Sequence, residues 1–126
     1  MPREVLLIDD SRAIHDLVRS RMAAEPFAIA SAFTGEDGLI AAKEITPDLI
    51  LLDVDLPDAS GLEICARLKA DPATAGIPVI FLTAAVSPDD RIYDEQTQAA
   101  DYISKPLNAA ELRARIRRAL STCSTR

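Results

Sequence analysis

The segment Asp48-Leu49-Ile50-Leu51-Leu52-Asp53 says more about the fold than any other part of the chain. Four consecutive apolar residues between two carboxylates are typical of a strand that is buried on both faces, as in parallel sheets. In open α/β sheets, ligands bind outside the carboxyl ends of the strands. Asp53 is therefore expected where such folds carry out their chemistry. The loop that follows contains Pro57 and Gly61, which predict a fixed turn.

Strand and helix patterns alternate along the chain. Strands are predicted near residues 5–8, 27–33, 48–53, 77–82 and 101–103. Helices are predicted to begin at Ser11, Thr34, Ser60, Ser87 and Asn108. The first of these helices is expected to end at Glu25-Pro26. Because alternating elements favour a parallel sheet covered by helices on both faces, we predict one α/β domain over residues 1–121, with residues 122–126 as a polar tail or the start of a linker.

The composition also indicates a single domain that is neither membrane-bound nor nucleic-acid-binding. The chain has 126 residues, of which 48% are hydrophobic, and a net charge of -6. An acidic protein is a poor candidate for binding nucleic acid by itself. The longest apolar run, residues 77–86, is too short to cross a bilayer, and the N-terminus lacks signal-peptide character, so we expect a cytoplasmic location. Cys65 and Cys123 are interpreted as free thiols.

Polar side chains stand at the ends of four predicted strands. Asp9 and Asp10 follow the first strand, Asp53 ends the third, Thr83 follows the fourth, and Lys105 follows the fifth. If these strands are neighbours, the five side chains converge on one edge of the sheet. Clustered carboxylates repel one another and raise one another's pKa values. A divalent cation relieves that repulsion, and oxygen ligands favour Mg²⁺, with Mn²⁺ as a second candidate, over zinc or copper.

A carboxylate beside Mg²⁺, a hydroxyl and an ammonium group is suited to accept a phosphoryl group. Asp53 is the candidate nucleophile, because aspartate can form an acyl phosphate. Lys105 and the metal would neutralise charge on the phosphoryl oxygens, and Thr83 could donate a hydrogen bond to them. Each residue alone has an ordinary structural explanation, and their occurrence in order at successive strand ends is what indicates function. The single histidine, His15, is expected at the surface of the first helix rather than at this site.

With these motifs the sequence resembles the receiver domains of bacterial two-component response regulators, over essentially its whole length. The matching segments are Leu6-Leu7-Ile8-Asp9-Asp10-Ser11, Asp48 to Gly61, Ile77 to Ala84 and Asp101 to Leu107. The resemblance implies a flavodoxin-like, doubly wound sheet of five parallel strands in the order 2-1-3-4-5, with five helices. It also implies a signalling phosphoacceptor rather than an enzyme, one that receives phosphate from a sensor histidine kinase or a phosphotransfer protein onto Asp53.

The resemblance further implies a set of metal ligands. Asp10 and Asp53 would bind Mg²⁺ directly, and Asp9 through water. Asp55 would contribute its backbone carbonyl. These assignments come from the family and not from the spacing of the acids alone.

Other positions match the family's phosphoryl contacts and switch. Thr83 and Lys105 would contact the phosphoryl group, and the small Ala84 would leave room for the donor. The Lys105-Pro106 peptide bond would be cis. Tyr102, three residues before the lysine, falls on the family's switch aromatic. Phosphorylation is expected to draw Thr83 inward, so that Tyr102 enters the space it leaves.

That movement would change the face made by the fourth helix, the fifth strand and the fifth helix, which is expected to control an output partner or domain. A diguanylate cyclase is one candidate for that domain. The last helix carries four arginines, Arg113, Arg115, Arg117 and Arg118. They form either a solvated face or, in a twofold homodimer, a set of ion pairs with acidic residues of a second subunit.

Three other interpretations compete with the receiver. Asp53-Val54-Asp55 resembles the Asp-x-Asp motif of haloacid-dehalogenase-type phosphatases, with Asp53 as nucleophile and Asp55 as acid/base. In that family the motif follows the first strand, whereas here an acidic pair comes first and the chain is short. A receiver fold used only for docking would lack one of the phosphorylation residues. A flavin-binding module would need a Ser/Thr-rich phosphate loop after the first strand.

Overall fold

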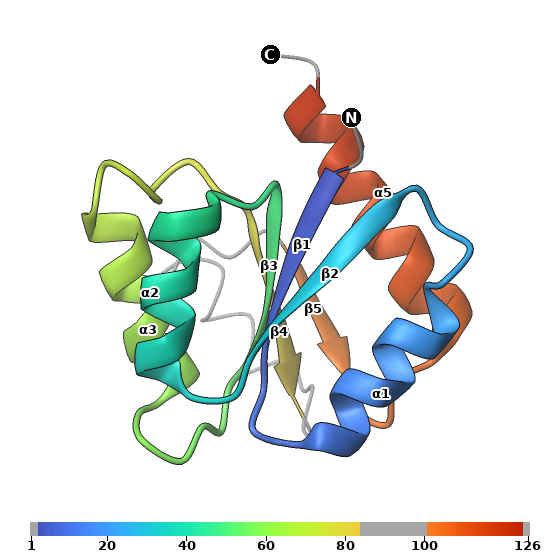
Figure 1. The fold of residues 1–126 in the computed structure, drawn as a ribbon, viewed down its shortest axis with the longest axis horizontal. Coiled ribbons are helices and arrows are strands. Elements are labelled where there is room, and N and C mark those ends of the chain that lie inside the picture. The colour runs from blue at the N-terminus through green and yellow to red at the C-terminus, as the bar shows by residue number, and fades with distance from the viewer. Residues whose placement is uncertain (1–2, 84–100, 125–126) are drawn as a thin grey trace.

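The computed structural model describes residues 3–83 and 101–124 (Figure 1). The predicted fourth helix and Ala84 lie outside these residues. In chain order the elements are β1 (Arg3–Ile8), α1 (Arg12–Arg21), β2 (Phe27–Ala32), α2 (Gly35–Ile45), β3 (Leu49–Asp53), α3 (Gly61–Ala70), β4 (Val79–Thr83), β5 (Asp101–Ser104) and α5 (Ala109–Ser124).

The strands form one parallel sheet in the order β2-β1-β3-β4-β5, which confirms the predicted order. β3 lies at the centre, and each of its residues is buried. Parallel pairing places the carboxyl ends of all five strands at the same edge of the sheet. That edge is the one on which the predicted site residues should meet.

The apolar run of β3 is continuous because both faces of the sheet are covered. Leu49 and Leu51 belong to a core between the sheet and the helices α1 and α5. Ile50 and Leu52 belong to a second core beneath α2 and α3. Figure 1 shows these two pairs of helices on opposite sides of the sheet. A strand between two cores cannot alternate apolar and polar residues, and so the sequence shows four apolar residues in a row.

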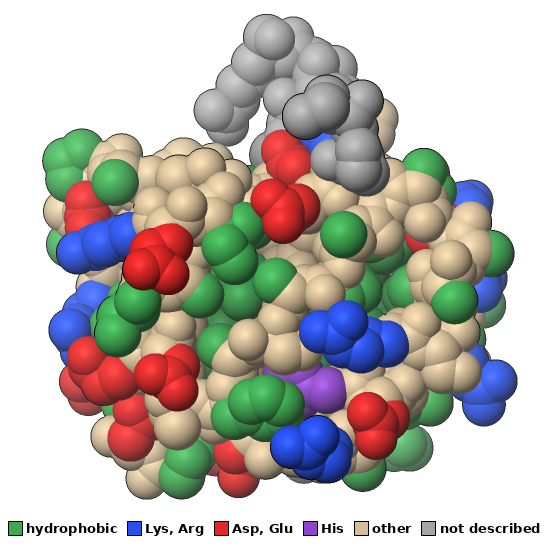
Figure 2. Space-filling view, viewed as in Figure 1, with side chains coloured by type: hydrophobic (Ala, Val, Ile, Leu, Met, Phe, Trp, Pro, Cys, Tyr) green, Lys and Arg blue, Asp and Glu red, His purple; other side chains and the backbone are tan. Residues whose placement is uncertain are grey.

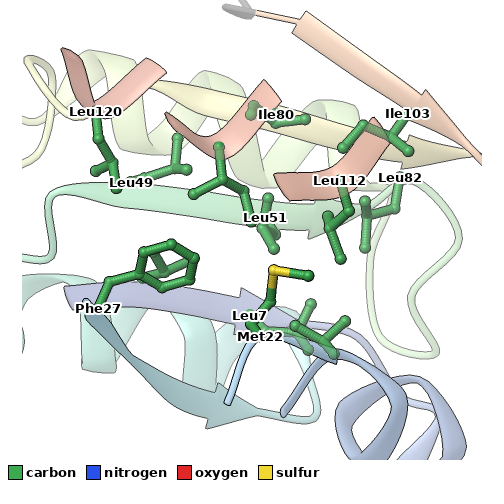
Figure 3. Close-up of a cluster of buried hydrophobic side chains, with 13 residues drawn as sticks. Leu7, Met22, Phe27, Leu49, Leu51, Ile80, Leu82, Ile103, Leu112 and Leu120 are labelled. Atoms are coloured by element: carbon green, nitrogen blue, oxygen red, sulfur yellow. The ribbon is translucent and has the colours of Figure 1, made fainter. Parts of the chain in front are cut away.

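The core beneath α1 and α5 contains side chains from the sheet and from both helices (Figure 3). Leu7 and Leu82 extend from the sheet, Met22 comes from the end of α1, and Leu112 comes from α5. Full burial of a leucine side chain contributes about 2 kcal/mol. This packing fixes the strands, and through them the residues at their carboxyl ends.

Side-chain caps begin the helices where the sequence predicts them. Ser11, Thr34 and Ser60 each accept a hydrogen bond from a backbone N–H in the first turn of their helix. Asn108 accepts one at 3.0 Å from the backbone N–H of Glu111, at the start of α5. Such caps satisfy backbone donors that have no partner within the helix, and so they fix where each helix begins.

Two helix ends differ from the prediction. α1 ends at Arg21, before the expected Glu25-Pro26, and the Glu25 carboxylate instead binds arginines of α5. α5 continues to Ser124, so the residues expected to start a tail at position 122 are helical that far. No glycine or proline stands in residues 109–124 to stop it. None of the described helices is long and apolar enough to cross a bilayer.

Candidate functional site

The carboxyl edge of the sheet carries the three predicted acids. Asp53 ends β3, and Asp9 and Asp10 follow β1, the neighbour of β3. One carboxylate oxygen of each residue lies within 4.8 Å of the others. Asp9 and Asp53 are buried, whereas Asp10 is exposed. The site therefore combines two shielded carboxylates with one that faces the solvent.

Lys105 reaches this cluster from the loop that follows β5. Its Nζ lies 3.2 Å from Oδ2 of Asp9 and 3.2 Å from Oδ1 of Asp53. Its backbone N–H donates a hydrogen bond of 2.8 Å to the carbonyl of Thr83, which holds the loop against the end of β4. The bond between Lys105 and Pro106 is cis, as the resemblance implies.

The charges of this cluster shift the protonation of its members. Burial raises the pKa of Asp53, and the charge of Asp9 raises it further, against the opposing effects of the Asp55 backbone N–H and Lys105. Burial alone would lower the pKa of Lys105, but attraction to Asp9 and Asp53 outweighs it, and the pKa is raised. The lysine therefore stays charged, while burial and the Asp9 charge oppose the ionisation of Asp53.

The donor set at this edge fits a divalent cation. Oδ2 of Asp9 is buried and accepts no hydrogen bond from the described residues, although the Lys105 ammonium is near it. The Lys105 ammonium is shared between Asp9 and Asp53, so one cation lies among three carboxylates. All three candidate ligands offer hard oxygen atoms, which suit Mg²⁺. The two observations together support the predicted metal site.

The loop after Asp53 is held close to it by backbone contacts. The backbone N–H of Asp55 donates a 3.2 Å hydrogen bond to Oδ1 of Asp53, while the Asp55 side chain is exposed. The backbone N–H of Gly61 donates a 2.7 Å hydrogen bond to the carbonyl of Val54. A Cβ atom at position 61 would collide with the carbonyl oxygen of Asp53. Only glycine lets α3 begin this close to the acceptor strand.

Thr83 and Tyr102 lie on the strands beyond Asp53. Thr83 is the buried last residue of β4 and pairs with Ser104 of β5. Tyr102 pairs with Phe81, is half-buried, and packs against the core beneath α2 and α3. Thr83 thus lies at the same edge of the sheet as Asp53, and Tyr102 lies on the neighbouring strand β5.

The expectation for His15 was wrong. Its side chain is only 2% exposed, and its ring nitrogens contact the Asp9 carbonyl at 2.7 Å and the Ser31 hydroxyl at 2.8 Å. A signal for this burial was available in the sequence. His15 precedes the buried Val18 by three residues and Met22 by seven, so all three lie on one face of the helical pattern.

The arginines of α5 have partners in their own chain. Arg113 and Arg117 pair with Glu25 at 3.1 and 2.8 Å. Arg115 pairs with Asp101. These ion pairs account for three of the four arginines without a second subunit. On the face shown in Figure 2, acidic and basic side chains are interspersed rather than gathered in a basic patch.

Sequence comparisons match the chain to response regulators. The family described as response regulator receiver domain matches residues 5–117. The chain is 41% identical to the DNA-binding dual master transcriptional regulator RpaA of Synechocystis, over 93% of this chain and 48% of the relative. It is 37% identical to the response regulator PleD of Caulobacter vibrioides, over 93% of this chain and 26% of the relative. The chain therefore spans half or less of the length of these curated relatives.

Structural comparisons agree with the sequence matches. A CheY-like response regulator receiver domain protein from Methanospirillum hungatei superposes with a TM-score of 0.89 at 26% identity, covering 99% of this chain and 98% of that one. The receiver domain of a sensor histidine kinase from Pseudomonas aeruginosa superposes with a TM-score of 0.86 at 25% identity, covering 96% and 99%. The latter is described with a magnesium ion coordinated in its active site cleft.

Proposed function

The chain belongs to the response regulator receiver domain family, and on that premise we propose that Asp53 accepts a phosphoryl group in a two-component signalling reaction. One observation carries the assignment to this residue. Asp53 ends the central strand, and its Oδ1 lies 3.2 Å from the Lys105 ammonium in a cluster with two further carboxylates. The family assignment favours this function over the phosphatase alternative.

The donor would be a phosphohistidine of a sensor kinase or a phosphotransfer protein. A carboxylate oxygen of Asp53 forms a bond to phosphorus, the P–N bond of the donor breaks, and its electron pair leaves with the imidazole nitrogen, which takes up a proton. Lys105 neutralises charge on the phosphoryl oxygens, and the Thr83 hydroxyl donates a hydrogen bond to them. The burial of Asp53 limits the access of water to the acyl phosphate. These roles describe a phosphoacceptor rather than a turnover enzyme.

Asp10, Asp53 and the backbone carbonyl of Asp55 would hold Mg²⁺, with Asp9 acting through water. The bound ion would supply positive charge beside the phosphoryl oxygens. Support comes from the three carboxylate oxygens within 4.8 Å of one another and from the burial of Oδ2 of Asp9, which has the Lys105 ammonium 3.2 Å away. Ala84, which would leave room for the donor, lies outside the described residues.

The output of the switch is a further proposal. Movement of Thr83 and Tyr102 would alter the surface around β5 and α5, and this surface would act on an output domain or a partner protein in the cytoplasm. In a homodimer through this face, Arg115 would exchange its own Asp101 for an acidic residue of a second copy. Sedimentation with and without a phosphate mimic tests this: a shift to a dimer that salt weakens supports it, and an unchanged monomer contradicts it.

Phosphorylation with a small acyl-phosphate donor and Mg²⁺ tests the acceptor. The wild-type chain should gain one phosphoryl group, stable in acid and labile in base, that maps to Asp53. The Asp53→Asn variant should gain none, because an amide is no nucleophile for this transfer. Asp58→Asn is the matched control, since it removes an exposed acid from the same loop, and it should be labelled like the wild type. Full labelling of Asp53→Asn would contradict the assignment.

A further inference from the structure

Three hydrogen bonds connect the surface of α1 to the backbone of the acidic pair. Nη2 of Arg19 donates to the Ser31 hydroxyl at 2.8 Å. The same hydroxyl lies 2.8 Å from Nδ1 of His15. On the other side of the ring, Nε2 lies 2.7 Å from the carbonyl oxygen of Asp9. The series joins α1, β2 and the end of β1, and it stops at a residue of the candidate metal site.

The chemistry of the two ends sets the direction of these bonds. A guanidinium can only donate, and a backbone carbonyl can only accept. Nε2 of His15 must therefore carry a hydrogen, which it donates to the Asp9 carbonyl. The Ser31 hydroxyl accepts from Arg19 and makes a second hydrogen bond with Nδ1. Both ring nitrogens of His15 therefore have hydrogen-bond partners.

The surroundings hold the ring in this position. His15 is nearly fully buried, and its ring lies against Phe33 with the centroids 4.2 Å apart and the planes inclined by 36°. The guanidinium carbon of Arg12 lies 5.6 Å from the centroid of the Phe33 ring. A ring packed and hydrogen-bonded in this way loses little further freedom when it holds the Asp9 carbonyl.

The Asp9 carbonyl is the part of the turn that most directly orients Asp10. The backbone N–H of Asp9 is fixed by a 3.1 Å hydrogen bond to Ala32, and its Oδ1 accepts from the backbone N–H of Ser11 at 2.9 Å. The carbonyl belongs to the peptide plane between Asp9 and Asp10. Because His15 fixes that plane, it also limits where the Asp10 carboxylate can lie.

We infer that His15, braced by Ser31 and Arg19, is a positioning residue that holds the Asp9-Asp10 turn in the geometry needed to bind a divalent cation. The inference rests on the proposed function. His15 touches neither the metal nor the phosphoryl group, and it acts only through the backbone of Asp9. Partners that orient metal ligands typically change metal affinity by about 10- to 100-fold when they are removed.

Magnesium binding to purified variants of the chain tests this role. His15→Leu removes both hydrogen bonds and fills the buried position with an apolar side chain. His15→Gln can keep a donor near the place of Nε2. Ser31→Ala removes only the brace on the ring. Ser20→Ala, at an exposed position of α1, is the matched control. Calorimetric titration with Mg²⁺ gives the dissociation constant of each, and thermal melting in a chelator gives the stability of each fold.

We expect the dissociation constant for Mg²⁺ to rise about tenfold in His15→Leu and less in Ser31→Ala, with His15→Gln recovering most of the loss. Phosphorylation of His15→Leu should be slow at low Mg²⁺ and recover at saturating Mg²⁺, because the acceptor itself is intact. A purely structural role would lower the melting temperature and leave the Mg²⁺ affinity of the folded protein unchanged.

The inference is overturned if a folded His15→Leu variant binds Mg²⁺ like the wild type. If that variant does not fold, Ser31→Ala decides instead, and wild-type Mg²⁺ affinity in Ser31→Ala overturns the inference. A wild-type chain that neither binds Mg²⁺ nor is phosphorylated would instead overturn the proposed function, and this inference with it. The wild-type measurement thus distinguishes the two failures.

Discussion

Asp53, at the end of β3, and Asp58, in the loop that follows it, have pKa values shifted in opposite directions. At the N-terminus of α2, Asp58 accepts hydrogen bonds from the backbone N–H groups of Gly35 at 2.8 Å and Glu36 at 3.0 Å, and these bonds lower its pKa. At the edge of the sheet, Asp53 is buried beside Asp9, and its pKa is raised. Only five positions along the chain separate the two acids.

The comparison distinguishes a carboxylate that stabilises the fold, Asp58, from one that we assign to function, Asp53. Asp58 is stabilised in its charged form, because donors at a helix N-terminus satisfy its oxygens. Asp53 is destabilised in its charged form, because burial and a neighbouring acid oppose ionisation. The fold thus gains stability from the first acid and loses stability to the second. We interpret that loss as the cost of a site that is completed by a cation and a phosphoryl group.

The largest effect is expected from Lys105→Met, which removes the ammonium beside Asp9 and Asp53. The Lys105 side chain is 24% exposed and that of Asp9 is fully buried. Loss of a cation from such a group should cost about 2 kcal/mol of unfolding free energy at neutral pH in a chelator. Removing the ammonium would raise the pKa of Asp53 further, so the cost should fade in acid, as the pH falls through the raised folded-state pKa of Asp53. Urea unfolding at neutral pH and in acid measures it, and equal stability at neutral pH would contradict the account.

Asp53→Asn should act in the opposite direction and stabilise the metal-free chain. Because the folded-state pKa of Asp53 is raised, the charged carboxylate costs stability above that pKa, and the cost disappears as the pH falls through it. The melting temperature should rise by a few degrees at neutral pH, and the two proteins should converge in acid. A lower melting temperature for the variant at neutral pH would show that the acid is satisfied.

Asp58→Ala should destabilise the chain, by a smaller amount. The lowered pKa means that stability from the charged form is present above the unfolded pKa and is lost as the pH falls through the folded pKa. We expect a drop of about two degrees in melting temperature at neutral pH, and a smaller one in acid. Asp16→Asn, an exposed acid on α1, is the control. An equal drop in both variants would mean that net charge, and not the cap, is responsible.

The smallest effect is expected from Glu36→Gln. Glu36 pairs with Arg67 at 2.8 Å, but the two side chains are 61% and 50% exposed. Solvent screens such a pair, and its loss should change the unfolding free energy by about 0.5 kcal/mol or less. A larger loss, measured by urea unfolding, would show that charge near α2 matters more than the hydrogen bonds that Asp58 accepts.

Much of the fold and of the candidate site is local enough to be read from the sequence. The apolar run before Asp53 predicts a strand buried on both faces, and the strand order follows from the family resemblance. The convergence of Asp9, Asp53 and Lys105 follows once the strands are neighbours, because parallel strands end at the same edge. The caps at Ser11 and Ser60 depend on residues within a single helical turn, which a sequence pattern can show.

The remaining features depend on contacts between distant segments. Asp58 caps a helix that begins 23 residues earlier, at Gly35. His15 is buried because Ser31 of β2 and the Asp9 carbonyl satisfy its nitrogens, and the expectation of an exposed histidine weighed its polarity above its place on the buried helix face. Arg117 reaches Glu25, 92 positions away. Sequence patterns do not show which of several acids an arginine will meet.

The response of the melting temperature to Mg²⁺ tests most directly whether the carboxylates around Asp53 form a metal-binding site. A ligand that binds only the native state stabilises it by mass action. Millimolar Mg²⁺ should raise the melting temperature of the wild type, and that of Asp58→Ala by the same increment from a lower start. Asp53→Asn should gain much less, because a ligand is missing. If Mg²⁺ leaves the wild type unchanged, or stabilises Asp53→Asn by the full increment, the account is contradicted.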